Sequence, residues 1–372
     1  MISLGLTRYS SGGSPICVRS RRMQGALFAA KRKEARVVDR VAILGFGSSG
    51  RRFASLISQR LPESELLVYS SQRLVGVPYN TTSNLSDIQK YGPTIAVICG
   101  VASERLRMAK SLPDKVRGVL VEKPFALTYQ EGLQLKDDLD RRGATVQVGY
   151  NLRFSPSLLE FKEKVESRAM GRVLTIRAET GQYLPDWRDG RDYRMTASAR
   201  QKSGGGVLRE LSHEIDFLRW IFGDVTWVSS WLGKQSDMEI DVEDTAFLTF
   251  GFAGDGAELS VVGQLNLDFV RRDRTRSVTA VCAEGTLRWD GAAGVVKKWA
   301  SDDSRWRVES ADGPSKLTTY ERQWDSFYSS AMRASSPQVT MSDGLAVLSI
   351  IEAATISHDS GGIRVPPRRR GM

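Results

Sequence analysis

Histidine and cysteine are both scarce in this chain of 372 residues, which contains two histidines and three cysteines. The cysteines are Cys17, Cys99 and Cys282; they are odd in number and far apart, so they suggest neither a disulfide framework nor a zinc-binding pattern. With so few nitrogen and sulfur ligands, we expect no metal site. Unpaired thiols are typical of a reducing compartment, which favours a cytoplasmic protein.

The chain also lacks long apolar runs. No stretch of 18 apolar residues occurs, so we expect no transmembrane helix and no membrane partner. The net charge of +10 comes from the two ends: residues 1–33 hold seven Arg or Lys and no acid, and Arg368, Arg369 and Arg370 lie near the C-terminus. The rest of the chain is balanced in charge and shows no basic stripe interleaved with aromatics, so we expect no specific nucleic-acid partner.

Residues 1–38 are therefore predicted to be a basic leader, and residues 367–372 a basic tail. The leader has the composition of an organelle transit peptide. A start codon placed upstream of the true one, or a disordered extension, would have the same composition, and we favour that interpretation.

A glycine-rich turn follows the first apolar strand. Residues 40–44 read as a short strand, and residues 51–60 have apolar side chains at helical spacing. Between them lies a GxGxxG pattern, which is weak alone but meaningful between a strand and a helix. It allows backbone N–H groups to approach a pyrophosphate at the helix N-terminus, although an ordinary glycine-rich turn remains the alternative. The predicted cofactor-binding residues here are Gly45, Phe46, Gly47, Ser48, Ser49 and Gly50.

The end of the next strand, residues 66–69, carries information about the cofactor. An NAD-binding domain usually places an acid there for the ribose 2′-hydroxyl. This chain instead has Ser70, Ser71, Gln72 and Arg73, which are hydroxyls and a guanidinium suited to a 2′-phosphate. We therefore predict that Ser70, Ser71 and Arg73 bind the cofactor and that NADP(H) is preferred over NAD(H).

The stretch VLVEKPFA, residues 119–126, ends a buried strand in two opposite charges, Glu122 and Lys123. Pro124 favours an extended Lys123, whose ammonium group would project from the carboxyl end of a parallel strand, where open α/β sheets bind ligands. A lysine there can exchange a proton with a substrate hydroxyl. The alternative is an ion pair at the edge of the sheet.

Strands and helices alternate up to Gly149, which predicts a doubly wound parallel sheet and an α/β dinucleotide-binding (Rossmann) domain over residues 39–150. Beyond it, strands cluster without helices between them at residues 225–232, 245–252, 257–265, 277–283 and 285–289. We therefore expect a second, α+β domain over residues 151–366 with a large, mostly antiparallel sheet. A helix over residues 207–222 would place His213 and Asp216 on a face that lines a cleft.

A polar and aromatic loop over residues 181–206 is longer than a simple connection between two elements requires, which is typical of a functional loop. Its residues suit a polar, ring-shaped ligand. The predicted catalytic residues are Lys123 and His213. The predicted substrate-binding residues are Lys123, Asn151, Arg153, Tyr183, Trp187, Arg191, Glu210, His213 and Asp216.

The motifs VAILGFGSSG, VEKPFA, VGYNLRFSP, SGGGVLRELSHEID, EDTAFL and IIEAATISHDSGGIRV, in this order, resemble the glucose–fructose oxidoreductase, inositol dehydrogenase and MocA (Gfo/Idh/MocA) family. The resemblance covers residues 39–365. It implies NAD(P)-dependent chemistry at a carbinol carbon of a sugar or cyclitol, and an open sheet that is often used for oligomerisation. It also implies an acid/base role for Lys123, a place for Glu122 near the nicotinamide, and His213 as the second acid/base candidate.

This chain departs from the family pattern at two places. Relatives often carry Asp four residues before the histidine; here that residue is Arg209, and the nearby acid is Glu210. After Cys99, where many relatives have Thr-Pro, this chain has Gly100-Val-Ala-Ser-Glu104.

We therefore expect an NAD(P)-dependent oxidoreductase that acts on a sugar, cyclitol or sugar derivative, as a homo-oligomer (dimer or tetramer). The alternatives are a dehydrogenase of nucleotide-linked or amino sugars in surface glycan synthesis, for which cationic Arg188, Arg191 and Arg194 would meet a phosphate or carboxylate, and a non-catalytic NADP-binding sensor.

Overall fold

The structure is a computed structural model that describes residues 39–253, 261–311 and 316–368. The predicted leader, the arginines at positions 369 and 370 and the first residues of the strand expected at 257–265 lie outside the described residues.

The first sheet has six strands in the order β3-β2-β1-β4-β5-β6, and every neighbouring pair is parallel. The strands are β1 (Arg40–Leu44), β2 (Glu65–Tyr69), β3 (Asn80–Thr82), β4 (Ile95–Ile98), β5 (Gly118–Val121) and β6 (Thr145–Val148). The strand order reverses direction between β1 and β4, and ligands bind outside the carboxyl ends of the strands at such a point. The predicted parallel sheet is confirmed, with β3 as an additional short edge strand.

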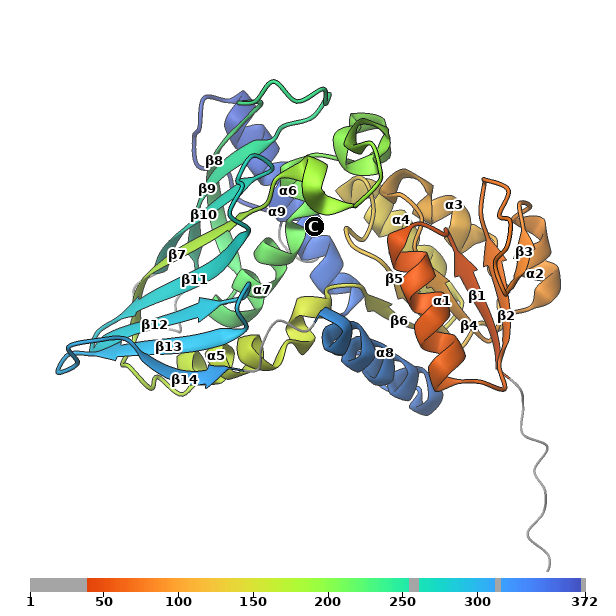
Figure 1. Ribbon diagram of the computed structural model, residues 1–372, viewed down its shortest axis with the longest axis horizontal. Coiled ribbons are helices and arrows are strands. Elements are labelled where there is room, and N and C mark those ends of the chain that lie inside the picture. The colour runs from red at the N-terminus through yellow and green to blue at the C-terminus, as the bar shows by residue number, and fades with distance from the viewer. Residues whose placement is uncertain (1–38, 254–260, 312–315, 369–372) are drawn as a thin grey trace, which may run out of the picture. The chain divides into compact units, whose positions relative to one another are not determined.

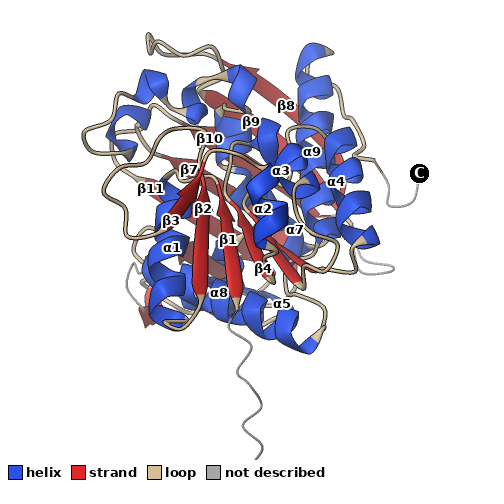
Figure 2. Cartoon of the chain, turned by 90° about the vertical axis from the view of Figure 1, so that its right-hand side faces the viewer, coloured by secondary structure: helices blue, strands red, loops and turns tan. Residues whose placement is uncertain are grey.

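Helices lie on both sides of this sheet (Figure 2), and alternate residues of its strands face these two layers. Val41 and Ile43 point to one face, where they share a core with Phe53 of α1 and with Trp324 and Phe327 of α8. The other face packs against α3 and α4. The helices are α1 (Ser48–Arg60), α2 (Ser86–Tyr91), α3 (Arg105–Lys110), α4 (Tyr129–Arg141) and α8 (Lys316–Arg333), and a short 3-10 turn η1 (Ala102–Glu104) precedes α3. Helix α8, which comes late in the sequence, thus completes the core on this face of the first sheet.

The second sheet has eight strands in the order β14-β13-β12-β11-β7-β10-β9-β8 (Figure 1). Only the pair β7 and β10 is parallel, so the predicted mostly antiparallel sheet is confirmed. The strands are β7 (Val173–Gly181), β8 (Val225–Gly233), β9 (Thr245–Phe252), β10 (Val261–Asp268), β11 (Thr275–Cys282), β12 (Gly285–Asp290), β13 (Val295–Ala300) and β14 (Arg307–Ala311). β13 and β14 were not expected from the sequence.

Helices cover one face of the second sheet (Figure 1). They are α5 (Pro156–Glu166), α7 (Ser212–Phe222) and α9 (Met341–Asp359). Phe217 of α7, for example, packs edge-on against Trp289 of β12, with ring centroids 5.4 Å apart. Apolar side chains at alternate positions of the other face, such as Trp231 and Phe247, are exposed.

The helix expected over residues 207–222 is in fact two helices. α6 (Val207–Glu210) is a single turn, Leu211 leaves the helical conformation, and α7 then begins at Ser212. The long loop before it contains the 3-10 turns η3 (Leu184–Trp187), η4 (Tyr193–Met195), η5 (Ala197–Ala199) and η6 (Gln201–Ser203), and η2 (Asn151–Phe154) follows β6. Among the described residues, none of the helices has the length and apolarity needed to cross a bilayer.

Candidate active site

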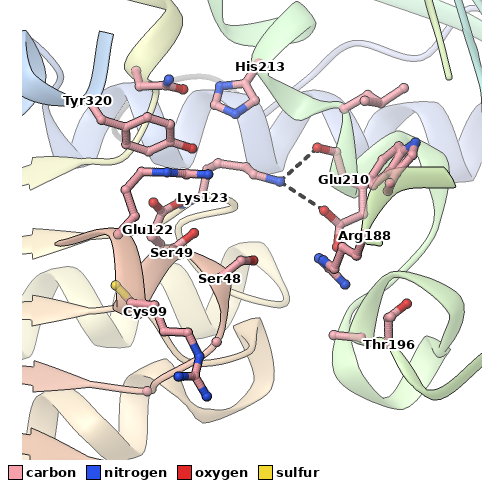
Figure 3. Close-up of a pocket in the computed structure, with 18 of the residues that line it drawn as sticks. Ser48, Ser49, Cys99, Glu122, Lys123, Arg188, Thr196, Glu210, His213 and Tyr320 are labelled. Atoms are coloured by element: carbon pink, nitrogen blue, oxygen red, sulfur yellow. Dashed lines mark hydrogen bonds and ion pairs between the residues drawn. The ribbon is translucent and has the colours of Figure 1, made fainter. Parts of the chain in front are cut away.

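A cavity of about 1590 Å³ lies at the carboxyl ends of β1, β2, β4 and β5 and extends to α6, α7 and the loop after β7 (Figure 3). Drug-sized ligands occupy clefts of roughly 300–1000 Å³. This cavity therefore has room for a dinucleotide and a sugar-sized molecule together.

The glycine-rich turn between β1 and α1 has the geometry that a dinucleotide requires. Gly45 has a φ of +101°, and a Cβ there would lie 2.5 Å from the backbone nitrogen of Gly100. A Cβ on Gly50 would lie 2.1 Å from the carbonyl oxygen of Gly45, whereas a Cβ on Gly47 would meet no atom within 4 Å. Gly45 and Gly50 thus need glycine for packing. Gly47 leaves open space before the N-terminus of α1, where a phosphate is favoured.

Five of the six predicted residues of this turn line the cavity: Gly45, Phe46, Gly47, Ser48 and Ser49. Gly50 is buried behind them and shapes the turn without lining it. No acid occurs in the first turn of α1, so nothing there would repel a phosphate.

The end of β2 differs in one respect from the sequence expectation. Ser70 and Ser71 line the cavity, as expected of cofactor-binding residues, but the exposed Arg73 does not. Three other guanidinium groups line the cavity near this turn: Arg107 is paired with Glu104, Arg52 lies over the Tyr320 ring, and Arg51 of α1 stacks over the Phe46 ring at 4.7 Å from its centroid.

Lys123 is held at both its backbone and its side chain. Its carbonyl oxygen accepts a hydrogen bond of 2.8 Å from the buried Arg105, whose Nε also donates to the carbonyl of Gly100. Its ammonium nitrogen donates to the backbone carbonyl of Glu210 at 2.8 Å and to the Glu210 carboxylate at 3.1 Å. An ammonium group has three donors, so one remains to point into the cavity.

Glu122 is buried beside Lys123. Its Oε2 accepts a hydrogen bond from the backbone N–H of Lys123, while its Oε1 has no hydrogen-bond partner within the described part of the chain. Burial raises the pKa of Glu122, although Lys123 and Arg105 oppose that shift. Glu122 therefore lines the cavity, and its Oε1 can accept a further hydrogen bond.

Glu210 takes the position beside the lysine because α6 ends there. Its carboxylate also accepts a hydrogen bond from the hydroxyl of Ser198 at 3.0 Å. Burial alone would raise the pKa of Glu210, but the ammonium of Lys123 and the Ser198 hydroxyl hold it below its usual value. The preceding residue, Arg209, lines a separate small cavity with Glu243, and so faces away from Lys123.

His213, in the first turn of α7, lines the main cavity and meets the Tyr150 ring edge-on at 5.7 Å between centroids. Burial, and then the positive charges of Lys123 and Arg276, lower the pKa of His213 well below its usual 6.5. The imidazole is therefore neutral at pH 7. Its Nδ1 is buried and has no hydrogen-bond partner among the described residues, so Asp216 does not fix the tautomer of the imidazole through this nitrogen.

Arg153 and Asp216, both expected to bind substrate, bind each other instead. Their side chains are 4% and 1% exposed, and two hydrogen bonds of 2.9 and 2.6 Å join them. Neither lines the cavity, so a direct contact with substrate does not fit this geometry. The guanidinium of Arg153 also lies over the ring of Trp220 in α7, at 5.3 Å from its centroid.

The other predicted substrate-binding residues divide between lining and supporting positions. Trp187 and Arg191 line the cavity, and so does Asn151, whose amide donates to the hydroxyl of Thr319. Tyr183 does not line it, and its ring is covered by the guanidinium of Arg272.

Among the described residues, seven cavity-lining arginines were not singled out by the sequence: Arg51, Arg52, Arg105, Arg107, Arg274, Arg276 and Arg322. Arg105 had no motif to mark it. Arg274 and Arg276 belong to the β11 region, and no local pattern shows that it pairs with β7.

Comparisons with known proteins agree with this arrangement. Residues 39–150 match the description "Oxidoreductase family, NAD-binding Rossmann fold", and residues 158–288 match "GFO/IDH/MocA C-terminal domain". The chain belongs to the Gfo/Idh/MocA family. This family membership and the two sheets confirm the resemblance inferred from the motifs, and the chain is a member of an oxidoreductase family whose relatives are named dehydrogenases.

This member of the Gfo/Idh/MocA family has curated relatives. D-xylose dehydrogenase from Paenarthrobacter nicotinovorans is 24% identical over 52% of this chain and 53% of the relative. Levoglucosan dehydrogenase from Pseudarthrobacter phenanthrenivorans is 33% identical over 32% of this chain and 31% of the relative. The chain thus spans about half or less of the length of these two curated relatives.

Two solved structures share the fold along their whole length. Levoglucosan dehydrogenase in complex with NADH and levoglucosan has a TM-score of 0.75 at 19% identity, with 89% of this chain and 99% of that chain covered. The WlbA dehydrogenase from Bordetella pertussis in complex with NADH and UDP-GlcNAcA has a TM-score of 0.71 at 19% identity, with the same coverage.

Proposed function

We propose that this protein transfers hydride between a nicotinamide dinucleotide and a carbinol or carbonyl carbon of a sugar, cyclitol or sugar derivative. The observation that carries the proposal is the grouping of Lys123, Glu210 and His213 in the cavity that the glycine-rich turn also lines. The turn from Gly45 to Ser49 would hold the dinucleotide phosphates, and Glu122 would lie beside its nicotinamide end.

When bound, the nicotinamide would accept hydride from a carbinol carbon or return it to a carbonyl carbon. The protein supplies the proton chemistry. The third N–H of the Lys123 ammonium donates to the substrate oxygen and stabilises negative charge on it, and the neutral imidazole of His213 accepts the hydroxyl proton in oxidation. In reduction the protonated imidazole of His213 returns that proton to the developing alkoxide, while Lys123 keeps its hydrogen bond to the oxygen.

The test is substitution of each group with a cofactor-binding measurement beside it. Lys123→Ala and His213→Ala should each lower kcat by a factor of about 10² to 10⁴, the usual contribution of a positioned acid or base, while calorimetry shows unchanged cofactor affinity. Lys110→Ala is a matched control, because this exposed lysine of α3 does not line the cavity. Turnover near that of the unsubstituted protein in both variants would refute the proposed mechanism, and tight cofactor binding without turnover on any sugar would favour the sensor.

We propose further that NADP(H) is preferred over NAD(H), with Ser70 and Ser71 at the 2′-phosphate. Arg51 lines the cavity and Arg73 does not, and of the other lining arginines nearby, Arg107 is paired with Glu104 and Arg52 lies over the Tyr320 ring, so Arg51 supplies the guanidinium. Arg51→Ala should raise the KM for NADP about tenfold or more and leave the KM for NAD unchanged, since a charge-assisted bond to the phosphate is lost. Arg73→Ala is the paired variant; if it, rather than Arg51→Ala, raises the KM for NADP, the assignment returns to Arg73.

Among the described residues, no helix covers the second face of the eight-stranded sheet, and we propose this face as the surface for homo-oligomerisation. Trp231 and Phe247 are 40% and 49% exposed there, with ring centroids 5.9 Å apart, and Leu174 and Val262 are also exposed. Exposed apolar patches on a sheet are characteristic of protein–protein interfaces. Light scattering should give a dimer or tetramer, and Phe247→Lys should shift it toward monomer; a monomeric unsubstituted protein would refute this.

A further inference from the structure

One wall of the main cavity is built from arginines of two segments that lie far apart in the sequence. Arg188 and Arg191 belong to the loop after β7, and Arg274 and Arg276 lie at the start of β11. The antiparallel pairing of β11 with β7 puts Arg276 opposite Thr180, and so brings both segments to the same wall. Figure 3 shows Arg188 across the cavity from Ser48 and Ser49, away from the glycine-rich turn.

The carboxylates of this wall are already engaged. Asp192 pairs with Arg194, which also pairs with Glu239, so Arg194 is not available as the sequence suggested. Glu210 pairs with Lys123. Among the described residues, Arg188, Arg191 and Arg274 have no carboxylate within ion-pair distance.

Arg276 differs from the other three because its position is fixed. Its Nε donates to the buried carboxylate of Glu214 at 2.7 Å, and the same Glu214 oxygen accepts the hydroxyl of Thr180 at 3.1 Å. Partial burial and the neighbouring Arg276 charge lower the pKa of Arg274. Arg276 thus has Glu214 as its counter-charge, whereas Arg274 beside it has none among the described residues, and a bound anion would supply one.

We propose that these arginines form an anion-binding subsite and that the substrate is a sugar or cyclitol derivative that carries a carboxylate or phosphate group. This inference rests on the proposed function and specifies its substrate class. A neutral sugar entering the cavity would displace water from several guanidinium groups without replacing it by charge, so the same wall that attracts an anionic sugar selects against a neutral one.

The position of the subsite follows from Arg276. Its guanidinium is bonded to Glu214, the residue after His213 in α7, so the anionic group would lie on the His213 side of the reacting carbon. Because guanidinium groups bind carboxylate and phosphate oxygens in pairs, they would also fix which hydroxyl of the ring faces Lys123.

The experiment compares matched substrate pairs, each an anionic sugar and its neutral parent: glucuronate with glucose, galacturonate with galactose, and glucose 6-phosphate with glucose. For at least one anionic member, we expect kcat/KM to exceed that of its parent by about 100-fold, and the carboxylate and phosphate arms distinguish the two sources of charge. Arg274→Gln should raise the KM for that member about 10- to 100-fold with kcat nearly unchanged, and should not raise the KM for the neutral parent. Arg288→Gln is the control, because this exposed arginine of β12 does not line the cavity.

Equal kcat/KM for anionic and neutral members, or an Arg274→Gln variant with unchanged KM, would overturn the subsite. So would an Arg274→Gln variant that raises only the cofactor KM, since the wall would then hold cofactor phosphates. If no member is turned over, the proposed function fails, and calorimetry with the cofactor present then decides the subsite separately. In that measurement the unsubstituted protein should bind glucuronate or glucose 6-phosphate in preference to glucose, and Arg274→Gln should abolish the preference; binding without preference overturns it.

Discussion

Glu210→Gln isolates the effect of one negative charge on the candidate acid/base group. The Glu210 and Lys123 side chains are 19% and 16% exposed, and their charged groups lie 3.1 Å apart. The glutamine keeps the size of the side chain and an oxygen acceptor, and the backbone carbonyl of residue 210 still accepts from Lys123. The variant therefore loses only the ionic part of the contact.

The magnitude follows from the difference between charged and neutral hydrogen bonds. A hydrogen bond to a charged group contributes about 1.5–3 kcal/mol and a neutral one about 0.5–1.5 kcal/mol, so the substitution should weaken the hold on Lys123 by roughly 1–1.5 kcal/mol. If the interaction between Glu210 and Lys123 stabilises the transition state, kcat falls about tenfold, since 1.36 kcal/mol is a factor of ten in rate. The cofactor KM should not change, because Glu210 lies on α6 and not at the glycine-rich turn.

Steady-state kinetics of Glu210→Gln in two backgrounds would test the reasoning. In a Lys123→Met background the glutamine should cost nothing further, because Glu210 acts through Lys123. A tenfold loss in both backgrounds would show that Glu210 acts on the substrate by itself. Adding Arg209→Asp, which restores the acid position of many relatives, should not rescue Glu210→Gln, because residue 209 faces the small cavity beside Glu243; recovery of kcat would refute the assigned orientation of α6.

Three further predictions concern the supporting structure. Gly50→Ala should lower both stability and cofactor affinity, because its Cβ would lie 2.1 Å from the Gly45 carbonyl, whereas Gly47→Ala, with open space around it, should lower cofactor affinity alone; thermal unfolding and calorimetry would show the difference. Asp216→Asn should reduce the free energy of unfolding by about 3 kcal/mol, since it leaves the buried Arg153 short of charge, and change kcat only slightly; a large loss of kcat in a stable variant would restore Asp216 to the site. His213 has a folded-state pKa below its usual 6.5, so the unfolded chain binds its proton first and stability should fall as pH drops below about 6.5. Denaturant titrations of His213→Gln should lack that part of the pH dependence, and an identical pH profile would contradict the shift.

The parallel sheet was predictable because its signals are local. Residues 41–44, 95–98 and 118–121 are continuous apolar runs, as expected for strands buried on both faces, and helical periodicity separates them. The glycine-rich turn and the two charges after β5 were also readable, because each occupies consecutive positions.

The missed features depend on contacts between distant segments. The break at Leu211 is not visible in helical periodicity, since the positions on both sides of it fit one helix. Arg153 looked like a ligand for substrate because nothing in the sequence pairs it with Asp216, which follows 63 residues later. Arg274 became a candidate only through the pairing of β11 with β7.

The position of Lys123 depends on both sheets of the molecule, which explains why no single motif could establish its role. Arg105 bonds to the carbonyls of Gly100 and Lys123 and so ties the end of β4 to the end of β5, which fixes the lysine backbone. Glu210, which stands among the elements of the second sheet, fixes the ammonium group. With either contact alone, the Lys123 side chain would keep conformational freedom that it must lose at the transition state. A displacement of its ammonium group by about 1 Å can lower the rate on the order of 100-fold. The acid/base geometry therefore exists only when the segment after β7 is docked on the carboxyl edge of the parallel sheet, so a perturbation of that docking should reduce kcat before it reduces cofactor binding.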